Sequence, residues 1–159
     1  MPKQSAGLLL YRVVEGDVEV LLVHPGGPYW AKKDEGAWSL PKGEYGGDED
    51  PLGVALREFR EELGLNPPDA GSTAFLGEVR QAGGKHVSAW ALEGDADVVT
   101  VRSNTFTMEW PRGSGRTAEF PEVDRAGWFD LEAARRKLLR GQLPFIDRLE
   151  ELLEGGLTS

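Results

Sequence analysis

Short apolar runs that end at Gly, Asp or Pro dominate the first two thirds of the chain. Runs of this kind are typical of β-strands. They predict strands over residues 6–14, 18–24, 72–81, 86–92 and 105–110. Gly83 and Gly84, between the third and fourth runs, predict a hairpin turn, and a loop containing Gly and Arg (111–117) follows the fifth.

The pattern changes to helical spacing over residues 51–63. Asp50 is a suitable cap, Pro51 suits the first turn, and Gly64 suits the position after the end. At ~100° per residue, four apolar residues form one stripe that we expect to face the core: Leu52, Leu56, Phe59 and Leu63.

Residues 131–139 and 144–153 predict one or two C-terminal helices. Strands interrupted by one central helix predict an α+β fold, in which a mixed sheet packs between helices as an α/β/α sandwich. With 159 residues, the chain is expected to form a single domain over residues 1–159.

Three glutamates crowd the end of the central helix. The helical wheel places Glu58, Glu61 and Glu62 opposite the apolar stripe, within a sector of ~100°. Glu58 and Glu62 are i,i+4 neighbours of like charge, which destabilises an isolated helix by ~0.2–0.5 kcal/mol. One interpretation is a solvated face on which Arg57 pairs with Glu61. The other is a site for a divalent cation, which would turn the repulsion into attraction.

Composition favours the cation. Residues 43–65 contain seven acidic side chains and two arginines. Carboxylate oxygens suit Mg²⁺ or Mn²⁺, and zinc is disfavoured because the chain has no Cys and only two His. Mg²⁺ is commonly shared between carboxylates and phosphates, so this face predicts chemistry on a phosphate.

The remaining bulk properties limit location and partners. No apolar run approaches the ~20 residues that a membrane span needs, and residues 6–11 lack a cleavage site, so we expect neither a membrane partner nor a signal peptide. The absence of Cys fits a reducing cytoplasm. The net charge of −9 disfavours a stable nucleic acid partner, whereas a small phosphorylated nucleotide can bind if the site supplies cations locally.

The segment 43–65 also resembles the signature of the Nudix hydrolases. That signature has a Gly, a Glu after five intervening residues, and then, after seven more, Arg-Glu-apolar-any-Glu-Glu-any-Gly-apolar. Every specified place is filled without a gap, by Gly43, Glu49, Arg57, Glu58, Phe59, Glu61, Glu62, Gly64 and Leu65. The resemblance implies a mixed sheet between helices and a metal-dependent hydrolase of nucleoside diphosphates linked to another group.

The same resemblance implies residue roles. Glu58 and Glu62 would be direct ligands of Mg²⁺, with Mn²⁺ as a possible substitute, and Glu61 would be a further ligand or act through water. Arg57 would orient these carboxylates. Glu49 would either fix the loop onto the helix or join the metal shell. Gly43 and Gly64 would have backbone roles.

Many members of this family recruit another carboxylate before a strand that carries a Trp. Glu122 precedes Trp128 and is preferred, with Glu119 in reserve. The implied reaction uses a metal-activated water and no covalent intermediate. Glu58 and Glu122 are both candidates for the general base, which stays unassigned.

Lys42, directly before Gly43, makes a Pro-Lys-Gly sequence that resembles the diadenosine polyphosphate hydrolases. Lys42 and Gly43 are therefore candidate substrate-binding residues, and the expected substrate is a dinucleoside polyphosphate such as diadenosine tetraphosphate. Alternatives within the enzyme class are nucleoside triphosphates, diphosphoinositol polyphosphates and RNA 5′ ends. The alternative of another class is a non-catalytic Nudix-like module that senses a nucleotide. Oligomeric state stays open. Basic loop residues are candidates to meet the distal phosphates: Lys32, Lys33, Lys85, Arg112 and Arg116. Four aromatic residues are candidates to stack on a base: Tyr29, Trp30, Trp90 and Trp110. Each is more simply explained as a solvated, core or rim residue, and none is assigned to the site.

Overall fold

A mixed sheet of six strands forms the centre of the protein, in a computed structural model that describes residues 3–68 and 72–157. The strand order is β4-β5-β1-β2-β8, and β3 pairs with β1 off this path. Strands β1 and β5 are parallel, and the other pairs are antiparallel. The strand bounds are β1 (Gln4–Val14), β2 (Asp17–Pro25), β3 (Lys42–Tyr45), β4 (Ala74–Arg80), β5 (His86–Glu93) and β8 (Val123–Asp130).

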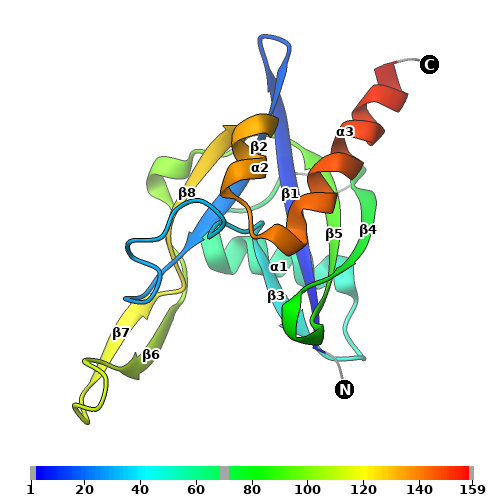
Figure 1. Cartoon of the computed structure of the whole chain (residues 1–159). Helices are drawn as coiled ribbons and strands as arrows, with labels where there is room; N and C mark the ends of the chain where they lie inside the picture. The colour runs from blue at the N-terminus through cyan, green and yellow to red at the C-terminus, as the bar shows by residue number, and fades with distance from the viewer. Residues whose placement is uncertain (1–2, 69–71, 158–159) are drawn as a thin grey trace.

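Helices cover both faces of this sheet (Figure 1). Helix α1 (Pro51–Leu63) lies on one face, and α2 (Leu131–Lys137) and α3 (Leu143–Leu157) lie on the other. Successive side chains of a strand point to opposite faces. Leu8 and Leu10 accordingly join the core beneath α1, and Leu9 joins the core beneath α2 and α3. The expected α+β fold with an α/β/α sandwich is confirmed.

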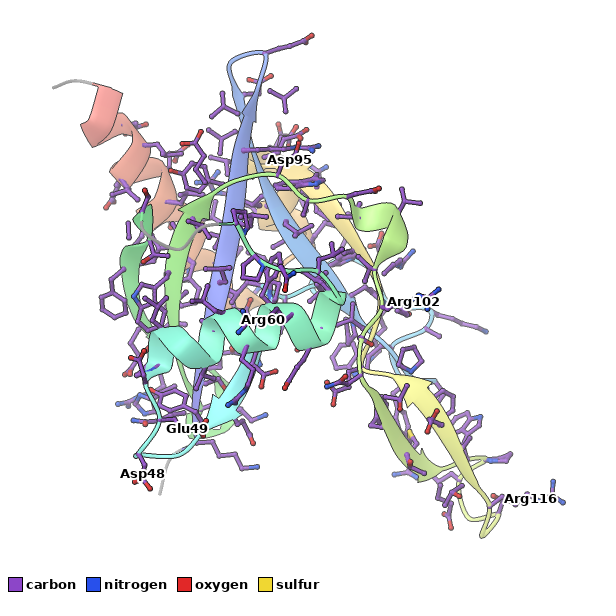
Figure 2. All side chains as sticks on the ribbon, turned by 180° about the vertical axis from the view of Figure 1, so that it is seen from behind. Asp48, Glu49, Arg60, Asp95, Arg102 and Arg116 are labelled. Carbon is purple, nitrogen blue, oxygen red and sulfur yellow. The ribbon has the colours of Figure 1, made fainter. Side chains whose placement is uncertain are left out.

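A second, two-stranded sheet projects away from the sandwich (Figures 1 and 2). Its antiparallel strands are β6 (Thr105–Glu109) and β7 (Thr117–Pro121). Three short 3₁₀ helices complete the described elements: η2 (Ala82–Gly84), η3 (Val98–Thr100) and η4 (Arg140–Gln142). None of the helices within the described ranges is long and apolar enough to cross a membrane.

The element boundaries follow local sequence signals where these are strong. Helix α1 has the predicted bounds: the side chain of Asp50 accepts from Gly53 N, and Gly64 ends the helix with φ 69°. Gly83 and Gly84 connect β4 to β5, as predicted. The hydrophobic pattern did not predict β3, β7 or β8, and only the family resemblance placed Trp128 of β8 on a strand. Strands β3 and β7 are short, and each pairs with one partner strand, β1 for β3 and β6 for β7.

The buried face of α1 differs from the predicted stripe. Phe59 and Leu63 are fully buried as expected, but Val54 and Ala55 are buried in place of Leu52 and Leu56, which are half-buried. The helix is therefore rotated toward its acidic side. The prediction that the three glutamates all face away from the core is wrong for Glu58 and Glu62: the Glu58 side chain is 14% exposed, and Glu62 accepts a hydrogen bond from the backbone of Lys42 in β3. Strand β3, which the wheel does not include, packs against this side of the helix.

Candidate functional site

Glu49 joins the loop after β3 to helix α1. Its Oε1 accepts from the backbone N–H of Gly46 at 3.1 Å, and its Oε2 accepts from Arg57 Nη1 at 2.8 Å. These two contacts, Arg57 first, hold the pKa of the Glu49 carboxyl below its ordinary value. Both oxygens thus have partners within the protein, which favours the loop-fixing role for Glu49 over a place in a metal shell. Figure 2 shows Glu49 at the start of this helix.

Arg57 lies among three carboxylates. Besides its hydrogen bond to Glu49, its Nη2 lies 3.6 Å from Glu58 Oε1 and its Nε lies 3.9 Å from Glu61 Oε1. Because the guanidinium is planar, one side chain can address several oxygens at once. This geometry is suited to orienting the acidic side chains.

Glu58 packs directly on the backbone of Gly43. A Cβ built on Gly43 would overlap the Glu58 carboxyl group. Burial raises the pKa of Glu58, with a further contribution from Glu61. A side chain at position 43 would therefore displace the Glu58 carboxylate from its place against this backbone.

Glu62 faces Lys42 across the contact between α1 and β3. The backbone N–H of Lys42 donates to Glu62 Oε1 at 3.3 Å. Burial raises the pKa of Glu62 to about 8, with Glu58 and Glu122 adding to the shift and Lys42 opposing it. Burial likewise lowers the pKa of the Lys42 ammonium. A buried carboxylate with a pKa this high is a mark of functional sites.

Glu122 reaches the same place from a distant part of the chain. Its backbone N–H donates to Asn104 O at 2.8 Å, and the backbone N–H of Asn104 donates to Glu61 O at 2.9 Å. Burial and the nearby Glu61 raise the pKa of Glu122. Two backbone hydrogen bonds thus connect the start of β8 to the end of α1.

Glu119 lies elsewhere. It pairs with Thr107 within the projecting β6–β7 sheet and is exposed. Glu122 lines the cavity that also contains Glu62, and Glu119 does not. Of these two carboxylates, the tertiary structure brings the preferred Glu122, and not Glu119, to the cavity that Glu62 lines.

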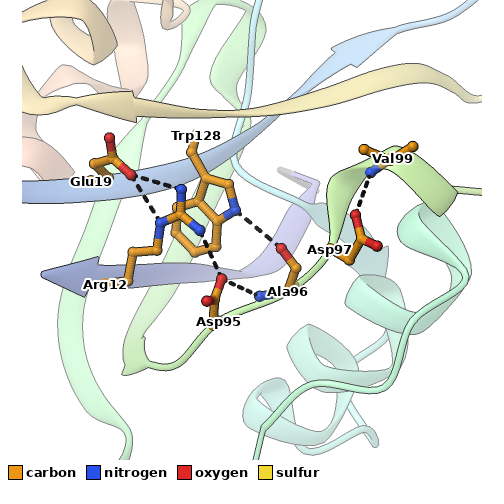
Figure 3. Close-up of polar contacts among 7 residues, drawn as sticks. All are labelled: Arg12, Glu19, Asp95, Ala96, Asp97, Val99 and Trp128. Carbon is orange, nitrogen blue, oxygen red and sulfur yellow. Dashed lines mark hydrogen bonds and ion pairs between the residues drawn. The ribbon is translucent and has the colours of Figure 1, made fainter. Parts of the chain in front are cut away.

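The segment that leads to Asn104 is fastened to the sheet by a cluster around Trp128 (Figure 3). The Arg12 guanidinium stacks on the Trp128 ring with 4.1 Å to its centroid, and it binds Asp95 at 2.8 Å and Glu19 at 2.8 Å. Trp128 Nε1 donates to Ala96 O at 3.1 Å. These contacts fix the path of the chain before Asn104 and the face of β8 after Glu122.

A cavity of about 190 Å³ adjoins Glu62 and Glu122. Its walls combine the two acids with one lysine, one serine and mostly apolar side chains: Val23, Pro25, Trp30, Ala37, Ser39, Lys42, Val123 and Leu139. This mixture is typical of small-molecule sites. It brings together residues from the start, the middle and the last third of the chain.

Sequence reasoning assigned no role to Trp30 and did not consider Gln142. Trp30 lies 92 positions from Glu122, so its place in the cavity wall has no local signal. Gln142 is fully buried; its Oε1 accepts from Leu40 N at 3.0 Å, and its Nε2 donates to Ser39 Oγ at 3.0 Å. It holds the segment that leads into Lys42, and its burial is invisible without the fold.

The donor set suits a hard divalent cation. Glu58, Glu62 and Glu122 are carboxylates whose pKa values are all raised, and each lies in the field of another acid. A cation would offset this repulsion, and oxygen ligands favour Mg²⁺ or Mn²⁺. Among the described residues, no three acidic or imidazole side chains already form a metal-binding group.

A family profile described as NUDIX domain matches residues 1–149 of this sequence. The chain therefore belongs to the NUDIX domain family. The resemblance carried by residues 43–65 is confirmed at this level.

Individual relatives are more distant. An RNA pyrophosphohydrolase of Halorhodospira halophila is 43% identical over 53 residues, which are 33% of this chain and only 28% of that relative. The crystal structure of a C. elegans Ap4A hydrolase binary complex has a TM-score of 0.62 at 24% identity, over 96% of this chain and 98% of that one. The NUDIX domain of Shewanella oneidensis NrtR, complexed with ADP ribose, has a TM-score of 0.65 at 18% identity, over 96% and 89%. These two structural similarities show the fold.

Proposed function

We propose that this protein is a Mg²⁺-dependent Nudix pyrophosphohydrolase that cleaves a phosphoanhydride bond in a nucleoside diphosphate linked to another group. The observation that carries this proposal is the shared cavity of Glu62, Glu122 and Lys42 beside the half-buried Glu58. Glu62 and Glu122, whose pKa values are raised, line this cavity together with the cationic Lys42 and the ring of Trp30. Such a site can accept a metal ion, a phosphate chain and a ring.

The proposed roles in metal binding follow from the positions of the residues. Glu58, Glu61, Glu62 and Glu122 would hold the metal, and Arg57 would fix the orientation of Glu58 and Glu61 through its two ion pairs. When bound, the cation would screen the phosphate charge and lower the pKa of an attacking water. Mn²⁺ is a possible substitute.

Proton transfer would involve two of the same carboxylates, and substrate contact would involve residues of β3. Glu58 and Glu122, both with raised pKa values, are the candidates to accept the proton of the water. Lys42 would contact the phosphate chain as a point charge, and Gly43 would let Glu58 approach β3.

Within this class we favour a dinucleoside polyphosphate such as diadenosine tetraphosphate. Lys42 lies directly before Gly43, as in the Pro-Lys-Gly branch, and a C. elegans Ap4A hydrolase is among the proteins of similar fold. The second candidate is an RNA 5′ end, which the local match to an RNA pyrophosphohydrolase favours. The net charge of −9 weighs against that polyanion. The expected cytoplasmic location stays a prediction.

A substrate panel tests the function. Diadenosine tetraphosphate, ATP, ADP-ribose and a 5′-triphosphorylated RNA would each be incubated with the protein, with Mg²⁺ and with chelator, and the products separated by chromatography. We expect Mg²⁺-dependent cleavage, fastest for diadenosine tetraphosphate. Faster cleavage of the RNA would replace the favoured substrate with the second candidate. Binding of a nucleotide without turnover would contradict the enzyme and favour a sensing module.

A further inference from the structure

The cavity beside the acidic cluster is too small for a substrate with two nucleoside ends. Its volume is about 190 Å³, whereas sites that enclose drug-sized ligands have ~300–1,000 Å³. It can hold one end of such a substrate, against Trp30. The other end has to lie outside the cavity, on whatever surface adjoins its mouth.

The loop between β2 and β3 connects the cavity wall to the outside. Trp30 lines the cavity, whereas the neighbouring Tyr29 is not one of its lining residues and is 49% exposed. Two hydrogen bonds fix this loop: His24 Nε2 donates to Lys33 O at 2.6 Å, and the backbone N–H of Gly26 donates to Glu122 O at 2.9 Å. Tyr29 is thus presented from a supported loop close to Glu122.

The projecting β6–β7 sheet packs tightly against the same loop. A Cβ at Gly26 would overlap the carbonyl oxygen of Pro121, and a Cβ at Gly27 would lie 2.9 Å from the ring of Phe106. Gly27 also has a φ of +97°, which favours glycine. Only glycines permit this approach, which sets where Tyr29 meets the projecting sheet.

An aromatic and cationic surface results where the loop and the projecting sheet meet. The rings of Tyr29 and Trp110 form an edge-to-face pair with centroids 5.7 Å apart and planes at 78°. Arg112 lies over the Tyr29 ring, with 5.9 Å from Cζ to the centroid. Trp110 is 36% exposed, so this pair is not a core contact. Within residues 3–68 and 72–157, Arg112 forms no ion pair with a carboxylate, in a chain with 27 acidic residues.

We propose that Tyr29, Trp110 and Arg112 form an outer subsite that binds the second nucleotide of a dinucleoside polyphosphate. Bases stack on exposed aromatic rings irrespective of their identity, and a guanidinium can both stack on an aromatic ring and bind a phosphate. The loop and the projecting sheet thereby select a two-ended substrate over a nucleoside triphosphate. This inference rests on the proposed function.

The test compares one-ended and two-ended substrates in matched variants. kcat and KM would be measured with Mg²⁺ for diadenosine tetraphosphate and for ATP, using the wild type, R112Q and W110A. We expect both variants to raise KM for diadenosine tetraphosphate by roughly 5- to 100-fold, the range that base stacking supports. KM for ATP should change by less than about twofold, because ATP does not reach the outer subsite.

Two further variants serve as controls. R116Q removes the same charge from the same projecting segment, where Figure 2 shows Arg116 at the far tip. This variant should leave KM unchanged for both substrates. W110F keeps an aromatic ring and should restore most of the loss seen in W110A. Equal losses for both substrates, or no loss for diadenosine tetraphosphate, would overturn the outer subsite.

Failure of the proposed function would give a different result from failure of the outer subsite. If the wild type cleaves neither nucleotide, the function is wrong, and the subsite is then judged by calorimetric binding of the same two nucleotides. A selective loss of diadenosine tetraphosphate affinity in R112Q would still support the subsite, and equal affinities in R112Q and the wild type would overturn it.

Discussion

The backbone of Gly43 and the carboxylate of Glu58 occupy adjoining space, so that a side chain at position 43 would displace this carboxylate between strand β3 and helix α1. Next to this contact, Glu62 accepts from the backbone N–H of Lys42 at 3.3 Å. The first glycine of the signature and two of its glutamates thus form one packed unit. Strand β3 desolvates the acids and also positions Lys42.

Substitution of Gly43 by Ala should damage this unit. The added methyl group would displace Glu58 or push β3 from the helix, and overpacking of this kind destabilises proteins by ~1–3 kcal/mol. We expect a lower free energy of unfolding in urea and a loss of hydrolysis greater than tenfold. Gly46→Ala is the matched control, since its Cβ would meet no heavy atom within 4 Å. Equal behaviour of the two variants would contradict the close packing.

Glu62→Gln should remove catalysis while preserving the fold. The substitution keeps the shape of the side chain but removes a proposed metal ligand, and loss of several kcal/mol of metal-dependent stabilisation corresponds to a rate decrease of about 100-fold or more. Initial rates with Mg²⁺, together with circular dichroism of the folded state, check this. Glu151→Gln, on the exposed side of α3, should retain the wild-type rate. Near-normal turnover in Glu62→Gln would remove Glu62 from the site.

The raised pKa of Glu62 also predicts a pH dependence of stability. Its pKa moves from 4.5 to about 8 on folding, so the folded protein binds more protons than the unfolded chain between these values. The free energy of unfolding should therefore fall as pH rises from about 4.5 to 8 and level off above. An ionised carboxylate that is desolvated destabilises the folded state. Between pH 4.5 and 8, the free energy of unfolding of Glu62→Gln should therefore fall by ~1–3 kcal/mol less than that of the wild type.

Urea denaturation at pH 5 and pH 8.5, with chelator present, measures this difference. Addition of Mg²⁺ at pH 8.5 should restore stability to the wild type more than to Glu62→Gln, because binding to the folded state stabilises it. Identical pH dependence in the two proteins would show that Glu62 is not the group that resists ionisation.

Glu122→Ala and Glu119→Ala should differ in their metal requirement. Glu122 lines the cavity with Glu62, while Glu119 is exposed on β7. We expect Glu122→Ala to raise the Mg²⁺ concentration for half-maximal activity about tenfold or more, and Glu119→Ala to leave it unchanged within about twofold. Magnesium titrations at saturating nucleotide provide the comparison. The reverse ranking would move the role to Glu119.

Local signals in the sequence were sufficient for the helix that bears the acids and for most of the central sheet. Asp50, Pro51 and Gly64 define the ends of α1, because capping and left-handed termination depend on residues within a few positions. The glutamates were found for the same reason, since their spacing along a helix is itself local. The Gly83-Gly84 connection between β4 and β5 likewise follows from backbone freedom at those residues.

The orientation of α1 and the assembly of the site depended on contacts between segments that are distant in the sequence. The orientation of α1 was predicted incorrectly because a helical wheel contains no β3, and it is β3 that makes Glu58 and Glu62 part of the buried side. Glu122 joins the acids through Asn104, and Trp30 joins them through the loop after β2. The sequence by itself determined which side chains are chemically able to hold a cation. Only the tertiary structure decided which of them are desolvated and share one cavity, because burial and proximity arise from packing between elements.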